Sequence, residues 1–89
     1  MQLSRHAIDK LETYGICCDR LISWQTALEQ GQRHLDLSTA ATVVVTVWEN
    51  RPWIAILSQD EERVITTYPT DHRTVTNRLG AGRWINPNT

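Results

Sequence analysis

The sequence predicts an α+β domain in which two N-terminal helices pack on one face of a three- to four-stranded antiparallel sheet. Apolar residues recur at helical spacing up to residue 31, β-branched and aromatic runs dominate residues 32–69, and the links between those runs are short. Short links force neighbouring strands to run antiparallel, and helices grouped before strands are typical of the α+β class. We therefore expect one domain over residues 1–89, with a helical part (1–31), a sheet (32–69) and a basic C-terminal segment (70–89).

The composition fits a folded domain of this size. The 89 residues are 40% hydrophobic and 21% charged, whereas disordered chains are poorer in hydrophobic residues. No apolar run approaches the length of a membrane span, and the first residues lack a secretory signal. Cys17 and Cys18 are adjacent, which is a poor spacing for a disulfide. These features predict a cytoplasmic protein with free thiols that does not contact membranes.

Residues 4–31 predict two helices. Ser4 can cap the first helix through its hydroxyl, apolar residues follow at three- and four-residue steps, and Gly15 suits the left-handed residue that ends a helix. The second helix is expected to begin near Cys18 or Asp19 and to end at Gly31. Its apolar stripe consists of Leu21, Trp24 and Leu28.

Residues 33–68 predict the strands. Residues 33–37 form a short edge strand, and the runs 42–48, 53–57 and 63–68 are rich in β-branched and apolar residues. Residues 49–52 and 58–62 are polar turns between them. Because the chain has no Phe, we expect Trp24 and at least one of Trp48 and Trp53 to fill the core.

The last twenty residues allow two interpretations. Thr70 could cap a helix over residues 71–79 that ends at Gly80, or residues 74–76 could form a strand. Gly80 and Gly82 predict a bend before Arg83, and residues 85–89 resemble a frayed tail.

Charge is distributed unevenly along the chain. Residues 1–62 carry a net charge of −4 and residues 63–89 a net charge of +3, so the whole chain has −1. A basic C-terminal third could meet phosphates or an acidic partner, although it is equally typical of a solvated surface.

The final predicted strand and the first helix carry the residues whose side chains could take part in catalysis. Strand alternation places Val64, Thr66 and Tyr68 on one face, where the two hydroxyl groups could hold a phosphate; both are also ordinary strand residues. His6 lies at the border of the first helix's apolar face, where it could be a general acid or base or a boundary residue with one satisfied nitrogen. His and Cys residues lack the spacing of metal ligands, so we expect no metal and no cofactor.

Short motifs make the chain similar to the small DUF4258 family of bacterial and archaeal domains. Members typically begin with His-Ala in the first helix, place Gly-Ile between the helices, and end on a strand reading Val-x-Thr-x-Tyr. The matching residues are His6-Ala7, Gly15-Ile16, and Val64, Thr66 and Tyr68. The resemblance covers about residues 3–69. The architecture is in turn similar to that of RelE-like and colicin-type (BECR-like) ribonuclease toxins.

The resemblance implies a metal-independent endoribonuclease of a toxin–antitoxin type, in which the ribose 2′-hydroxyl attacks the adjacent phosphate. His6 would be the acid or base, and Thr66 and Tyr68 would orient the RNA. Trp84 or Trp48 would stack on a base. The remaining candidates are Arg83 as a catalytic phosphate clamp and Arg63, His72, Arg73 and Arg78 as substrate-binding residues. The pI of about 6.3 departs from what an RNA-cleaving toxin would have.

A second hypothesis is a non-catalytic module that grips a protein through the sheet or its edge strand. The near-neutral net charge favours this alternative. The ribonuclease hypothesis predicts RNA and an antitoxin as partners, and the second hypothesis predicts another protein. An unpaired edge strand could also pair with its twin in a homodimer.

Overall fold

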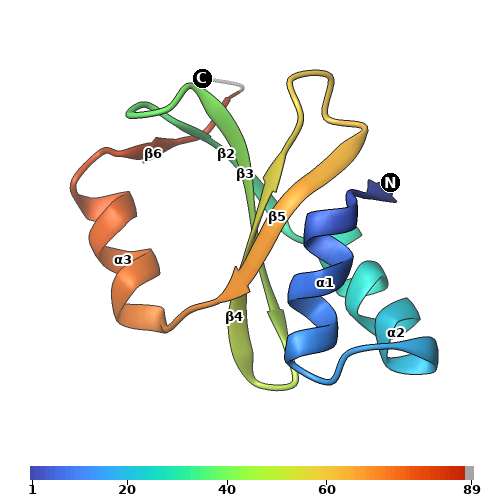
Figure 1. The fold of residues 1–89 in the computed structure, drawn as a ribbon. Helices are drawn as coiled ribbons and strands as arrows, with labels where there is room; N and C mark the ends of the chain where they lie inside the picture. The colour runs from blue at the N-terminus through green and yellow to red at the C-terminus, as the bar shows by residue number, and fades with distance from the viewer. Residues whose placement is uncertain (88–89) are drawn as a thin grey trace.

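The computed structural model describes residues 1–87 and confirms the α+β class, with three helices and six strands in that part of the chain (Figure 1). Asn88 and Thr89, the end of the predicted tail, lie outside the described residues. None of the helices in residues 1–87 is long and apolar enough to cross a membrane. The elements in chain order are β1 (Gln2–Leu3), α1 (Arg5–Thr13), α2 (Cys18–Glu29), β2 (Gln32–Asp36), β3 (Ala41–Trp48), β4 (Arg51–Leu57), β5 (Arg63–Pro69), α3 (His72–Gly80) and β6 (Trp84–Ile85).

The sheet is mixed and wider than the sequence predicts. Its strand order is β1-β5-β4-β3-β2-β6, and β2 to β5 form the expected antiparallel meander. β1 pairs in parallel with β5, and β6 pairs in antiparallel with β2. Each of these outer strands has only two residues, so the alternation of apolar and polar residues in the sequence is too short to predict it. The predicted three- to four-stranded antiparallel sheet is therefore the centre of a six-stranded one.

Local signals set the boundaries of α1 and α2. The Ser4 hydroxyl accepts a hydrogen bond from the Ala7 amide at 3.0 Å, as expected of the N-cap. Gly15 has φ +74°, the left-handed conformation predicted for the end of the first helix. α2 begins at Cys18 and ends at Glu29, so Gly31 lies two residues beyond it.

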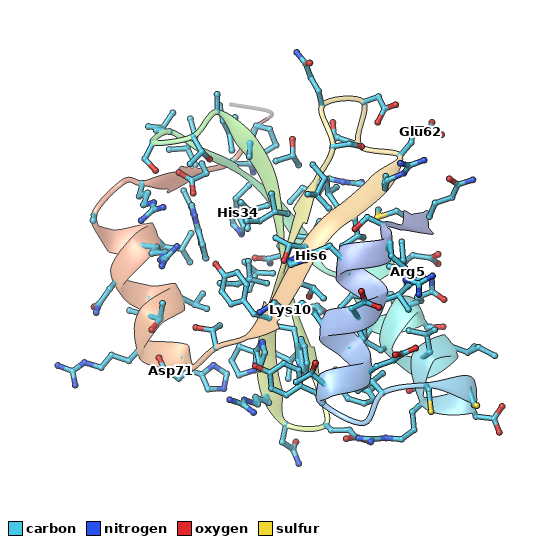
Figure 2. The ribbon with its side chains drawn as sticks, viewed as in Figure 1. Arg5, His6, Lys10, His34, Glu62 and Asp71 are labelled. Atoms are coloured by element: carbon cyan, nitrogen blue, oxygen red, sulfur yellow. The ribbon has the colours of Figure 1, made fainter. Side chains whose placement is uncertain are left out.

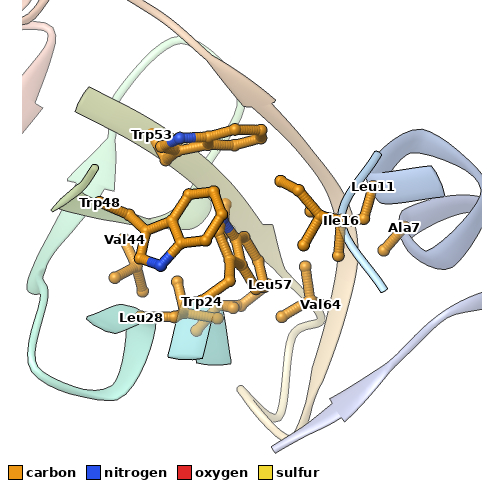
Figure 3. Packing of buried hydrophobic residues seen from close by; sticks show 11 residues of the cluster. Ala7, Leu11, Ile16, Trp24, Leu28, Val44, Trp48, Trp53, Leu57 and Val64 are labelled. Carbon is orange, nitrogen blue, oxygen red and sulfur yellow. The ribbon is translucent and has the colours of Figure 1, made fainter. Parts of the chain in front are cut away.

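α1 and α2 cover one face of the sheet and enclose the main core (Figure 3). Trp24 of α2 is fully buried, and its ring lies edge-on to the Trp53 ring at 6.0 Å between centroids. Trp48 packs edge-on to the same ring at 6.2 Å. The prediction that Trp24 and at least one of Trp48 and Trp53 belong to the core is confirmed.

α3 lies on the opposite side of the sheet, where a second buried cluster forms around Val43, Ile54 and Trp84 of the edge strand β6. The helical interpretation of residues 71–79 is confirmed, but the N-cap is Asp71, whose carboxylate accepts from the Thr74 amide at 2.7 Å. Thr70 instead continues the sheet, because its amide donates to the Pro52 carbonyl.

A β-bulge in β5 changes which side chains share a face. The register shifts between Ile56 and Leu57, so Leu57 lies opposite Val64 while Ile56 lies opposite Thr66. Val64 therefore belongs to the core beneath the helices, and Tyr68 packs in the cluster on the α3 side. The prediction that Val64 faces the same way as Thr66 and Tyr68 is wrong, because the extra residue resets the two-residue alternation.

We expect Gly31→Ala to destabilise the protein by about 1–3 kcal/mol, because overpacking forces the surrounding structure to shift. A Cβ at Gly31 would lie 2.7 Å from Val44 Cγ1 and 2.8 Å from the carbonyl oxygen of Val45, a backbone atom with little freedom to move. Urea denaturation measures the change.

Gly80→Ala is the matched control for this substitution. A Cβ there would meet nothing within 4 Å, and Gly80 lies in the last turn of α3 without a left-handed φ. We expect it to stabilise the protein by about 0.5 kcal/mol, since alanine loses less backbone freedom on folding. Equal effects of the two substitutions would contradict the steric explanation.

Candidate functional site

α1 runs alongside β5, and both of its ends are tied to the sheet (Figure 1). At its start, the Ser4 amide donates to the Val64 carbonyl at 2.9 Å and the Ser4 hydroxyl donates to the Ile65 carbonyl at 2.6 Å. At its end, the Tyr14 ring lies edge-on to the Trp53 ring at 5.5 Å, and Trp53 is the strand partner of Pro69. Helix and strand therefore run side by side in the same direction.

Because α1 and β5 run in the same direction, each residue of α1 lies at the same height along the strand as a particular residue of β5, and we call two such residues level. A helix rises about 1.5 Å per residue, so His6 lies about 3 Å and Lys10 about 9 Å beyond Ser4 along the helix. A strand rises about 3.3 Å per residue, so Thr66 and Tyr68 lie about 3 Å and 10 Å beyond Ile65. His6 is thus level with Thr66, and Lys10 is level with Tyr68.

Both side chains turn towards β5. Figure 2 shows His6 and Lys10 projecting from the side of α1 that faces this strand, whereas Arg5 projects away from it. His6 and Lys10 are four residues apart and so share one helical face. Both are exposed, and neither makes a hydrogen bond or ion pair within residues 1–87. Two unengaged basic groups therefore border β5 together.

The hydroxyl groups of Thr66 and Tyr68 occupy the α3 side of β5. Both residues are half-buried, and they lie opposite Ile56 and Ile54 in the sheet. β1 ends at Leu3, opposite Val64, so no strand within residues 1–87 pairs with β5 on its outer side at Thr66 and Tyr68. α1 covers the other face of the sheet, so β5 itself lies between these hydroxyl groups and the helix that carries His6.

The basic residues expected to bind substrate fall into two groups. Arg63, at the start of β5, and His72 and Arg73, in the first turn of α3, are exposed. Arg78 and Arg83 are instead engaged in the structure around Trp84. The Arg78 guanidinium lies over the Trp84 ring at 5.2 Å, and Arg83 Nε lies 3.3 Å from Asp36 Oδ1.

Trp84 does not offer the exposed ring that base stacking requires. It is only 2% exposed, and its Nε1 donates to Asp36 Oδ2 at 3.2 Å. The His34 ring stacks on it at 6.1 Å between centroids. Trp48, the alternative base-stacking residue, is also buried. The geometry therefore does not support either tryptophan as an exposed stacking platform.

Asp36 is the centre of this network. Burial raises the pKa of its carboxyl, but hydrogen bonds from Arg83, Ser38 and Trp84 outweigh that effect and lower the pKa to about 2. The carboxylate is therefore ionised at neutral pH and holds β6 to β2. Asp36 thus acts as an anchor for the C-terminal part of the sheet.

Sequence reasoning gave no functional role to two basic residues that the structure makes notable. Lys10 could have been found from its four-residue spacing to His6. His34 could have been found from the alternation within β2, which places it on the same face as Asp36. His34 is 8% exposed, its Nδ1 has no hydrogen-bond partner within the described part of the chain, and burial lowers its pKa.

Neither a metal site nor a known relative helps to assign a function to these residues. Within residues 1–87, His, Cys, Asp and Glu side chains form no group of three that could hold a metal ion. Comparisons with protein-family models, curated proteins and solved structures find no significant match to the chain. The similarity to the DUF4258 family therefore depends on the sequence motifs alone.

Proposed function

We propose that this protein is a metal-independent endoribonuclease of the toxin type, with its active site along the edge of β5. The observation that carries the proposal is the level alignment of His6 with Thr66 and of Lys10 with Tyr68. It follows from the Ser4 hydrogen bonds to Val64 and Ile65. A base and a second cation then border one stretch of β5 from the α1 face, and two hydroxyl groups border it from the α3 face.

The reaction in this proposal is attack of a ribose 2′-hydroxyl on the adjacent phosphorus. His6 accepts the 2′-hydroxyl proton while the 2′-oxygen forms a bond to phosphorus and the bond from phosphorus to the 5′-oxygen breaks. The Lys10 ammonium stabilises the charge that develops on the phosphate and supplies the proton for the leaving 5′-oxygen. The products are a 2′,3′-cyclic phosphate and a 5′-hydroxyl end.

The remaining site residues act on the substrate backbone in this proposal. Thr66 and Tyr68 donate hydroxyl hydrogen bonds to phosphate oxygens. Arg63 and Arg73, which are exposed, bind flanking phosphates. Arg83 has no part in this site, because it pairs with Asp36 of β2 beside β6, at the opposite edge of the sheet from β5.

The motifs shared with the DUF4258 family have clear roles in such a scaffold. Ala7 is fully buried where α1 packs on the sheet, so the residue beside His6 must be small. Gly15 adopts φ +74° at the turn between the helices, and Ile16 is buried in the core. These roles concern packing and turn geometry; the toxin in this proposal is cytoplasmic, RelE-like and held by an antitoxin.

His6→Ala is expected to lower the rate of RNA cleavage about 100-fold, the lower end of what a general base contributes. The assay follows an end-labelled single-stranded RNA with purified protein in EDTA, and mass spectrometry identifies the cyclic phosphate. Growth arrest on expression should be lost in parallel.

Arg5→Ala is the matched control, because Arg5 is the neighbouring exposed cation and turns away from β5 (Figure 2). It should cleave RNA as the unaltered protein does. Cleavage at equal rates by the His6→Ala protein, or no cleavage by the unaltered protein, would refute the proposal.

A second candidate function is the protein-binding module, which one feature of the sheet favours. β6 pairs only with Leu35 and Asp36, so residues 32–34 of β2 have an edge that no strand within residues 1–87 covers. A partner strand could add there by backbone hydrogen bonds. Such binding would survive His6→Ala, whereas RNA cleavage would not.

A further inference from the structure

A pocket of about 150 Å³ lies where α1, α2 and the β3–β4 hairpin meet. Its apolar lining comes from Ile16, Trp48 and Trp53, which are all buried. The Tyr14 ring, 45% exposed, stands beside Trp53, and Arg20 and Arg51 contribute cations. None of these residues has a role in the reaction proposed above.

The size of the pocket suits one flat ring. An engineered protein cavity of about 150 Å³ with apolar walls binds benzene, which has the same number of ring atoms as a pyrimidine. A purine, with two fused rings, would need more space. The exposed Tyr14 ring offers a surface on which a base could stack, an interaction that tolerates any base with a flat face.

The cations lining the pocket are not equivalent. Arg20 is engaged, because its Nη2 lies 2.8 Å from Glu49 Oε2 and its guanidinium covers the Trp48 ring at 5.1 Å. Arg51 is exposed and makes no ion pair or hydrogen bond through its side chain within residues 1–87. It is thus available to an anion attached to the ring that fills the pocket.

The pocket also lies in line with the proposed active site. His6 and Lys10 share one face of α1, and Tyr14, the C-cap residue of the helix, follows four residues after Lys10 at the same spacing. Tyr14 is about 12 Å from His6 along the helix axis. An RNA strand that passes His6 and follows α1 would therefore reach the pocket with a nearby nucleotide.

We propose that this pocket binds the base of a pyrimidine nucleotide, with Tyr14 stacked on the base and Arg51 paired with its phosphate. The role of the pocket as an RNA subsite rests on the proposed ribonuclease function. Binding of the nucleotide itself does not require cleavage, so the two proposals can fail separately.

The test is a titration of the His6→Ala protein with uridine 5′-monophosphate, followed by tryptophan fluorescence. Trp48 and Trp53 line the pocket, so an occupied pocket should change the emission in a saturable way. Adenosine 5′-monophosphate should bind at least about tenfold more weakly because of its size, and ribose 5-phosphate should give no change. Tyr14→Ala and Arg51→Ala should each weaken uridine 5′-monophosphate binding about tenfold.

Arg5→Ala serves as the control and should bind uridine 5′-monophosphate unchanged, since Arg5 is exposed and outside the pocket. No saturable change with uridine 5′-monophosphate would overturn the pocket assignment, even if RNA is cleaved. Equal binding of ribose 5-phosphate would show phosphate binding alone and would also overturn it. Tighter binding of N-acetylphenylalanine amide than of uridine 5′-monophosphate would assign the pocket to a protein partner's aromatic side chain and refute the nucleotide.

A second readout connects the pocket to cleavage. If the unaltered protein cleaves RNA, its cut sites should lie at a constant offset from a pyrimidine. Tyr14→Ala should then keep cleaving but lose that preference. An unchanged cleavage pattern in the Tyr14→Ala protein would contradict the subsite role.

Discussion

Trp24→Ala is expected to lower the free energy of unfolding by about 3–5 kcal/mol, the range measured for large aromatic residues in protein cores. Trp24 is fully buried at the centre of the layer between α2 and the sheet, in contact with Trp53 (Figure 3). The free energy of unfolding of such domains is only about 5–15 kcal/mol, so the variant should have little stability left. Urea denaturation followed by circular dichroism measures the loss.

Two further substitutions separate the lost volume from the lost indole N–H. The Trp24 Nε1 is buried and has no hydrogen-bond partner in residues 1–87, so Trp24→Phe removes an unsatisfied donor along with some volume. We expect it to cost only about 1–2 kcal/mol. Ile22→Ala, two residues earlier on α2 and 64% exposed, should change stability by less than about 0.5 kcal/mol. A Trp24→Ala protein as stable as the Ile22→Ala protein would contradict the core assignment.

Asp36→Ala is expected to destabilise the protein by about 3 kcal/mol, because it leaves buried and charged donors without an acceptor. The carboxylate accepts from the Ser38 amide and hydroxyl, both at 2.9 Å, from Arg83 Nε at 3.3 Å and from Trp84 Nε1 at 3.2 Å. The buried Trp84 N–H has no other acceptor among the residues that the structure describes, so β6 should separate from β2 first. In the Asp36→Ala protein, the backbone amide of Ile85 should exchange its hydrogen faster than in the unaltered protein, through a local opening that precedes global unfolding.

The pH dependence isolates the charge on Asp36. Folding lowers the pKa of this carboxyl from 3.8 to about 2, a difference that corresponds to about 2 kcal/mol of stability. A lowered pKa stabilises the folded state above pH 3.8, and the contribution is lost as the pH falls through about 2. The stability gap between the unaltered protein and Asp36→Asn should therefore be constant above about pH 5 and shrink between about pH 4 and pH 2.

The Asp36→Asn comparison controls for other carboxylates that titrate in the same range. Hydrogen bonds lower the pKa of Asp60 and of Asp71 as well, so the stability of both proteins should fall in acid. Those contributions cancel in the difference between the two proteins. A gap that stays constant down to pH 2 would show that the Asp36 charge does not stabilise the fold.

The parts of the fold that the sequence predicted are those set by neighbours along the chain. The Ser4 cap, the turn at Gly15 and the strand runs at 42–48 and 53–57 depend on contacts or propensities within a few residues. The same holds for the two alternatives at residues 70–80, where the Asp71 cap decides for the helix. The positions of the apolar stripes likewise predicted that Trp24 would be buried.

The sequence by itself determined the two N-terminal helices, the central meander and the tryptophan core, because their signals are periodic and local. Only the tertiary structure decided three other features: the bulge that turns Val64 into the core, the pairing of Asp36 with Trp84 across 48 residues, and the alignment of His6 with Thr66. The physical reason is that each of these depends on register between segments distant in the chain, set by a few hydrogen bonds and packing contacts. No local pattern of residue types records such a register.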